Sequence, residues 1–309
     1  MTIFIPGGDT LSAHNSPRTG ILLMLTGVSI VPFMDGLAKY LAAYYPVTQI
    51  VWGRFFFHFL FMLPLILVAY RGEVLRVRQP VLQVVRGGFL LAATLCFFWS
   101  LKDLSIPDAL TLLFVSPLLV TCLSPVLLGE HVGIRRWTAV IVGFAGVCIV
   151  LRPGGGAFQL ASLAALGAGL CHACYILSTR WLSGTAPPPV TLFYTSLLGM
   201  VVLSIYIPWH WQVPEPAHLG LLVAIGAIAA GGHYLFIKAF DYAEASLLAP
   251  FGYGEIVMAT VVGYLGFGDF PDPVSWLGIA VIIASGIYIA VREHRVHIEV
   301  QPDEGQVVG

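Results

Sequence analysis

Charged residues are scarce in this chain, and their scarcity excludes a soluble globular protein. Only 10% of the 309 residues are charged, whereas 58% are hydrophobic. A soluble domain carries about 25% charged residues because its surface faces water. The chain has too little polar surface to cover a water-exposed globule, so its composition predicts an integral membrane protein.

Long polar connections are also missing, which leaves no room for a separate soluble domain. Each apolar segment is close to the roughly 20 residues with which a helix crosses a bilayer. The ten segments lie at about 19–40, 47–70, 81–101, 107–128, 137–152, 159–182, 189–208, 217–240, 245–267 and 274–291. Residues 1–18 lack the basic region and cleavage site of a secretory signal, so we expect the first segment to remain as a span. The prediction is an all-α membrane protein of ten transmembrane helices.

Signatures of enzymes and metal sites are absent too. The sequence contains neither HExxH nor HxxxxD, and no G-K-[ST] follows the glycines of RPGGG at 152–156. The run CHAC at 171–174 holds good metal ligands, but no second Cys/His cluster completes a tetrahedral site. We therefore expect no enzymatic activity, no cofactor, no resident metal and no nucleic-acid partner.

Basic residues indicate the orientation of the chain, because short cytoplasmic loops collect Lys and Arg. A cytoplasmic N-terminus puts these on the cytoplasmic side: Arg18, Arg71, Arg76, Arg78, Arg86, Arg135, Arg136, Arg180, Lys238, Arg292 and Arg295. Lys39, Lys102 and Arg152 then lie outside, and Arg54 lies within a span. Both termini are expected in the cytoplasm.

The sequence also contains signs of an internal duplication. A shift of 136 residues aligns Lys102 with Lys238 and Asp108 with Glu244, and Pro-Val-Thr occurs at 46–48 and again at 189–191. Five spans in each half would make the second copy enter the membrane from the opposite side. The predicted organisation is an N-terminal tail, two inverted repeats and a C-terminal tail, at 1–18, 19–152, 153–291 and 292–309.

These halves carry motifs that resemble a known family. DALTLLFVSPL and LLGEH in the first half, with EASLLAP and GYLGFGDFPD in the second, resemble the EamA family of the drug/metabolite transporter superfamily over about residues 19–292. The resemblance is greatest to bacterial amino-acid exporters of the YddG type, and other relatives carry riboflavin or S-adenosylmethionine. Asp269 stands where the second-half motif usually has Glu. The resemblance implies a ten-helix secondary transporter.

Polar side chains within apolar spans are the candidate substrate-binding residues. A charge at the bilayer centre costs about 2.5–3.5 kcal/mol on insertion scales, so each one needs a protein or water partner. The predicted set is Asp35, Arg54, His58, Ser116, His172, Tyr175, His233, Tyr234, Tyr253 and Glu255. Arg54 has two open roles: an ion pair with Asp35 or Glu255, or direct contact with substrate.

Helix-breaking residues divide three of the predicted spans. Proline removes a backbone hydrogen bond and glycine loosens a helix, so the ninth span should bend at its centre. The candidate hinge residues are Gly87, Gly88, Pro117, Pro125, Pro250, Gly252 and Gly254. Static kinks that only improve packing are the alternative.

The sequence thus predicts an alternating-access transporter of the bacterial inner membrane, with lipid around it and a small-molecule substrate. The resemblance favours export of amino acids, aromatic and other neutral ones, and the alternative is another metabolite such as riboflavin or S-adenosylmethionine. We expect a monomer, with a dimer as the alternative.

Overall fold

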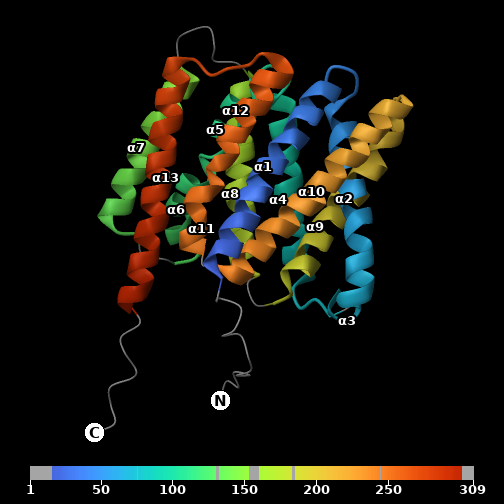
Figure 1. Ribbon diagram of the computed structural model, residues 1–309. Helices are drawn as coiled ribbons and strands as arrows, with labels where there is room; N and C mark the ends of the chain where they lie inside the picture. The colour runs from blue at the N-terminus through green and yellow to red at the C-terminus, as the bar shows by residue number, and fades with distance from the viewer. Residues whose placement is uncertain are drawn as a thin grey trace.

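The computed structural model describes residues 16–74, 76–129, 132–152, 160–182, 185–243 and 245–300, and this part of the chain is helical without strands (Figure 1). The helices are α1 (Pro17–Leu41), α2 (Val47–Ala69), α3 (Arg71–Val74), α4 (Pro80–Ser100), α5 (Ile106–Leu113), α6 (Ser116–Leu127), α7 (Ile134–Leu151), α8 (Leu160–Trp181), α9 (Pro188–Tyr206), α10 (Pro216–Tyr242), α11 (Ala245–Gly252), α12 (Gly254–Phe267) and α13 (Pro273–Val300). The tails at 1–15 and 301–309 lie outside the described residues.

Most of these helices are long enough to span a membrane. Nine helical stretches in the described residues are long and apolar enough to cross a membrane, with α5 and α6 counted as one stretch. The ten predicted segments are all helical, but the segment at 245–267 is divided at Tyr253 into α11 and α12 and is not among the nine.

Small residues let the long helices approach closely. α1 packs along α10, α4 along α8, α7 along α13, and α2 lies against both α9 and α10. Gly20 of α1 faces the end of α10, where a β-carbon would come within 2.7 Å of Ala243 Cβ. Gly226 of α10 similarly faces the backbone of α2. A β-carbon at Gly226 would lie 2.9 Å from the backbone nitrogen of His58. Small residues at helix crossings are typical of membrane proteins, where van der Waals packing drives association.

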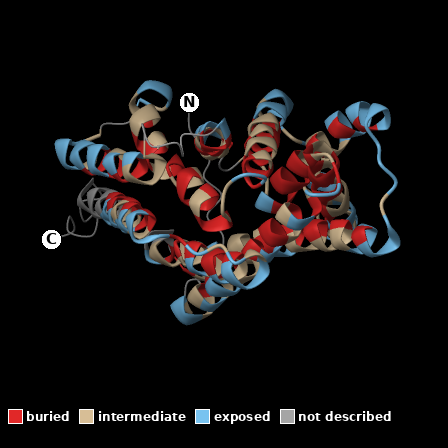
Figure 2. Ribbon diagram, turned by 90° about the horizontal axis from the view of Figure 1, so that it is seen from above, coloured by how far each residue is buried: buried red, intermediate tan, exposed pale blue. Residues whose placement is uncertain are grey.

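Buried residues lie on the helix faces that turn toward one another, and exposed residues cover the outer faces (Figure 2). Many exposed side chains are large and apolar, among them Leu22, Phe61, Val68, Ile141 and Leu265. An apolar outer surface is suited to contact with lipid rather than water.

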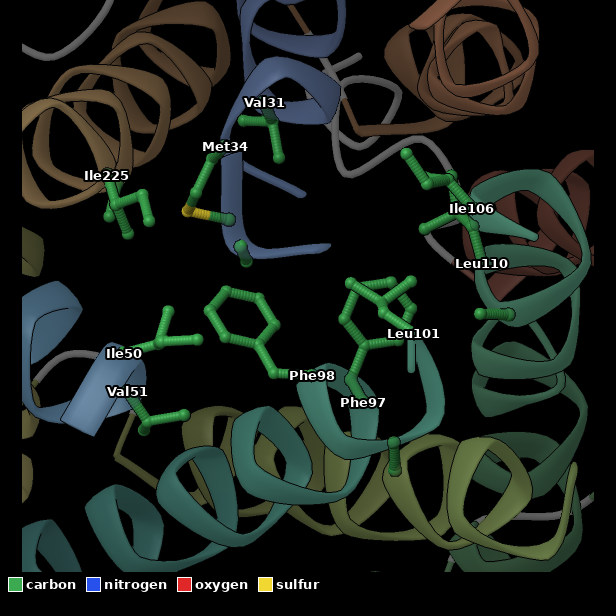
Figure 3. Close-up of a cluster of buried hydrophobic side chains, with 14 of the residues drawn as sticks. Val31, Met34, Ile50, Val51, Phe97, Phe98, Leu101, Ile106, Leu110 and Ile225 are labelled. Carbon is green, nitrogen blue, oxygen red and sulfur yellow. The ribbon is translucent and has the colours of Figure 1, made fainter. Parts of the chain in front are cut away.

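The two ends of the bundle differ. α1 begins and α13 ends at the lower end in Figure 1, which we call the terminal side. The opposite end is the far side. On the far side, apolar side chains from α1, α2, α4, α5 and α10 form a packed cluster that includes Met34, Val51, Phe98, Leu101 and Ile225 (Figure 3).

Candidate functional site

A central cavity of about 320 Å³ lies among the helices. Its size falls at the lower end of the roughly 300–1,000 Å³ typical of small-molecule sites. The lining comes from α1, α2, α4, α5, α8, α10 and α12, and its polar members are Asp35, Arg54, Thr94, His172, Tyr175, His233 and Glu255. The structure therefore brings six of the ten predicted substrate-binding residues to one space.

The charged groups of the cavity are two carboxyl groups and one guanidinium. Asp35 and Arg54 are 2% and 6% exposed, and Glu255 lies in the first turn of α12. Arg54 Nη1 donates a hydrogen bond to Thr94 Oγ1, and Arg54 Nε is buried without a partner. Within the described residues, no ion pair joins Arg54 to Asp35 or Glu255. Of the two roles left open for Arg54, the ion pair with an acid is therefore not formed among the described residues, where the guanidinium bonds to a hydroxyl on α4.

Three histidines stand in or beside this space. His172 Nδ1 lies 3.2 Å from Ser116 Oγ, the hydroxyl at the start of α6. His233 Nδ1 donates to the carbonyl of Ala229 at 2.7 Å, which directs its other ring nitrogen away from the α10 backbone. His58 lies behind His233, with ring centroids 5.7 Å apart, and its Nε2 is buried without a partner. Ser116 and His58 thus contact lining residues without lining the cavity themselves.

A second cavity of about 520 Å³ adjoins the first, and we call it the vestibule. It lies on the terminal side, because its lining includes Leu182 at the end of α8, Pro188 at the start of α9 and Asp241 near the end of α10. Three residues line both cavities: Tyr175 of α8 with His233 and Phe236 of α10. These three residues form what we call the neck.

The far side is closed by polar contacts as well as by the packed cluster. Lys39 Nζ, at the end of α1, lies 2.6 Å from Asp269 Oδ2 and donates to the carbonyl of Leu104 at 2.7 Å. Tyr45 Oη and His218 Nδ1 are 2.9 Å apart. Hydrogen bonds and apolar packing therefore cover the far side, and the vestibule lies between the central cavity and the terminal side.

Comparison with known proteins matches this architecture to a family. The EamA-like transporter family matches the chain twice, over residues 18–152 and 159–291. The chain belongs to this family. It is thus a membrane transporter of the EamA type, and the central cavity lies inside a transport protein.

Curated relatives of this EamA-like transporter differ in substrate. A riboflavin transporter of Vibrio cholerae serotype O1 is 29% identical over 92% of this chain and 96% of its own length. An S-adenosylmethionine uptake transporter of Rickettsia prowazekii is 26% identical over 93% of this chain and 96% of its own. The pseudopaline exporter CntI of Pseudomonas aeruginosa is 26% identical over 89% and 94%. The relatives include both uptake and export proteins.

A solved crystal structure shares the fold. It superposes with a TM-score of 0.65 at 19% sequence identity and covers 91% of this chain and 99% of that chain. At this level of identity the likeness concerns the fold alone.

Two predicted residues of this EamA-like transporter lie away from the central cavity. Tyr234 is 36% exposed and lines a shallow outer groove with Phe61 and Met62. Adjacent residues on a helix point about 100° apart, and here His233 faces the cavity whereas Tyr234 turns outward. Tyr253 is buried at the break between α11 and α12, where its ring lies 5.1 Å from that of Phe114.

Three of the predicted hinge residues, Pro117, Gly252 and Gly254, lie next to breaks in two of the spans. Tyr253 separates α11 from α12, and Phe114 with Val115 separates α5 from α6 just before Pro117. Pro250 and Pro125 lie inside α11 and α6.

The glycines among the hinge candidates differ in their surroundings. α4 runs without interruption through Gly87 and Gly88. Gly87 instead allows close packing, because a β-carbon there would approach Leu198 to 2.8 Å. Gly252 has open space around it, and Gly254 begins α12.

Arg86 is absent from the predicted site residues, because its basic side chain was interpreted as a cytoplasmic topology signal. The structure buries Arg86 within α4 at 3% exposure. Its guanidinium donates to Thr179 Oγ1 at 2.7 Å, to the Thr191 carbonyl at 3.1 Å, to Thr195 Oγ1 at 2.6 Å and to Tyr175 Oη at 2.6 Å. Its place, seven residues into a segment that begins at Pro80, marks it as an intramembrane charge.

Proposed function

We propose that this chain is a secondary transporter that carries a small amphipathic metabolite through the central cavity by alternating access. The observation that supports this most is the lining of that cavity, which combines ionisable groups of both signs with the aromatic rings of Phe97, Phe98 and Phe236. Small-molecule sites typically pair an apolar wall with a few placed polar groups.

The charges favour a substrate with a cationic amine. Asp35 and Glu255 both line the cavity, and neither is neutralised by an ion pair with Arg54 within the described residues. A positive group would offset the cost of holding carboxylates away from water. A substrate carboxylate could bind Arg54, whose Nε has no partner.

An aromatic or other neutral amino acid has this combination of groups, and we propose export of such a compound as the function. S-adenosylmethionine, which is named for the Rickettsia relatives, also pairs positive charge with a planar ring. It is the second candidate, together with the riboflavin named for the Vibrio relative. A longer molecule would extend from the central cavity through the neck into the vestibule.

An inverted repeat is the proposed basis of alternating access. Two separate family matches support it, as do the packing pairs, since α1 lies along α10 in the way that α8 lies along α4. Exchanging the halves 19–152 and 153–291 maps one pair onto the other. α11 and α12 together would form the ninth of the ten spans, broken at Tyr253.

The terminal side is proposed to face the cytoplasm of a bacterial inner membrane, as the basic residues favour. With the vestibule on that side and the far side closed, the structure would be the inward-facing state. One chain encloses the central cavity, so the proposed working unit is a monomer.

The substrate assignment can be tested in proteoliposomes with radiolabelled phenylalanine, S-adenosylmethionine and riboflavin. We expect uptake of phenylalanine, competed by unlabelled aromatic amino acids. Glu255→Gln should reduce this uptake by about tenfold, because a hydrogen bond to a charged group contributes about 1.5–3 kcal/mol. Tyr234→Phe is the matched control and should leave uptake unchanged, since Tyr234 lies on the outer surface. Transport of riboflavin or S-adenosylmethionine alone would contradict amino-acid export.

A further inference from the structure

Arg86 and Tyr175 form a structured contact at the meeting point of the two cavities. The Arg86 guanidinium lies over the Tyr175 ring, 4.4 Å from its centroid, and donates to its phenol oxygen at 2.6 Å. The ring of His172, one turn earlier on α8, is nearly parallel to the Tyr175 ring, with centroids 5.8 Å apart and an interplanar angle of 14°. Tyr175 therefore contacts a cation that lines the vestibule and lies beside an imidazole that lines the central cavity.

The same guanidinium is fixed from three helices. It belongs to α4 and bonds to Thr179 on α8 and to Thr191 and Thr195 on α9. A planar guanidinium that donates hydrogen bonds from several nitrogens has little freedom to move. The phenol that it holds is consequently fixed as well, although Tyr175 faces open space in both cavities.

The other two members of the neck lack such an anchor. Among the described residues, the side chain of His233 is hydrogen-bonded only through Nδ1 to its own helix, and Phe236 has no polar group. Both belong to α10, whereas Tyr175 belongs to α8. Tyr175 is thus the neck residue whose position depends on one side-chain hydrogen bond, the one from Arg86.

We propose that Arg86 is a positioning residue that holds Tyr175 as the wall of the neck, so that passage between the central cavity and the vestibule requires the Tyr175 ring to leave the guanidinium. This role rests on the proposed transport route through the neck. A buried arginine with only a packing role would instead stabilise the bundle without affecting passage.

A cysteine-labelling experiment tests this without any substrate. The five native cysteines are replaced, and Ala93→Cys provides a reporter on α4 in the lining of the central cavity. A charged methanethiosulfonate reagent is added from the terminal side of reconstituted vesicles. Since no transported compound is present, a wrong substrate assignment leaves this test valid.

Tyr175→Phe keeps the ring and removes its bond to Arg86. We expect the reporter to be modified about tenfold faster, the effect of losing one hydrogen bond to a charged group on a two-state equilibrium. Arg86→Lys should accelerate modification similarly, because an ammonium cannot make the same set of hydrogen bonds as the planar guanidinium. Tyr234→Phe is the matched control: it makes the same chemical change on the outer surface, away from both cavities, and should leave the rate within about twofold of the parent.

The thermal stability of each variant separates positioning from folding. A Tyr175→Phe protein with parental melting temperature and faster modification supports the proposal. Modification at the parental rate or slower in that folded variant would overturn it. Equal acceleration in Tyr234→Phe would also overturn it, because loss of any tyrosine hydroxyl would then explain the result.

Discussion

Replacing Lys39 by Gln should open the far side of the transporter. The ammonium bridges three places in the chain, since it belongs to α1 and binds the Asp269 carboxylate after α12 and the Leu104 carbonyl before α5. A glutamine cannot supply the charge, and its shorter side chain cannot reach both acceptors. The variant removes a contact between elements that must separate if the far side is to open.

The exposure of the two side chains sets the size of the effect. Lys39 and Asp269 are 16% and 30% exposed, which is between a surface pair and a buried pair. A surface pair contributes about 0.2–1 kcal/mol, and removing one partner of a fully buried pair costs about 3–5 kcal/mol. For Lys39 we expect about 1–2 kcal/mol, equivalent to a fivefold to thirtyfold shift toward the far-side-open state.

The Ala93→Cys reporter measures this shift when the charged reagent is added from the far side. In the Lys39→Gln variant, the reporter cysteine should be modified about fivefold to thirtyfold faster than in the parent. Asp269→Asn should have a smaller effect, because Lys39 keeps its bond to Leu104. Lys238→Gln is the control: Lys238 and Asp241 are 2.9 Å apart, but both lie on α10 and join no separate elements.

An unchanged rate in a folded Lys39→Gln protein would refute the reasoning, since the ion pair would then contribute nothing to closure. A rate increased equally in Lys238→Gln would show that loss of any lysine, rather than of this bridge, is responsible.

Three further predictions follow from packing, hinges and helix capping. Gly226→Ala should lower the melting temperature, because its β-carbon would meet the α2 backbone, whereas Gly231→Ala on the same helix has open space and should not. Pro250→Ala with Gly252→Ala should slow substrate turnover more than it weakens substrate binding, measured by flux and equilibrium binding, if the α11–α12 break is a hinge; equal loss of both would indicate a binding role. Asp272 accepts hydrogen bonds from the Ser275 backbone N–H, the Arg152 side chain and the Val274 backbone N–H, in that order of effect, and these hold its pKa below its usual range. The ionised Asp272 carboxylate therefore stabilises the fold above its pKa in the unfolded chain, and this stabilisation is lost as pH falls through its pKa in the folded protein. The melting temperature of the parent should consequently fall more between pH 5 and pH 2 than that of Asp272→Asn.

Composition and spacing alone determined the class of this protein. A bilayer requires long apolar helices, so the scarcity of charge predicted the membrane, and the apolar segments predicted the nine candidate spans within the described residues. Charges are costly at membrane depth, and for this reason Asp35, Arg54 and Glu255 could be singled out from the sequence. The helix-breaking residues near Tyr253 likewise predicted the break that the structure has between α11 and α12.

The tertiary structure alone decided which face of each helix turns inward. A membrane helix is apolar toward lipid and toward its neighbours, so periodicity does not separate the two faces. Tyr234 consequently lies on the outer surface although His233 lines the cavity, and Arg54 binds Thr94 instead of an acid. Arg86 has partners on two other helices that only folding brings together, because hydrogen-bond partners distant in the chain leave no local signal in the sequence.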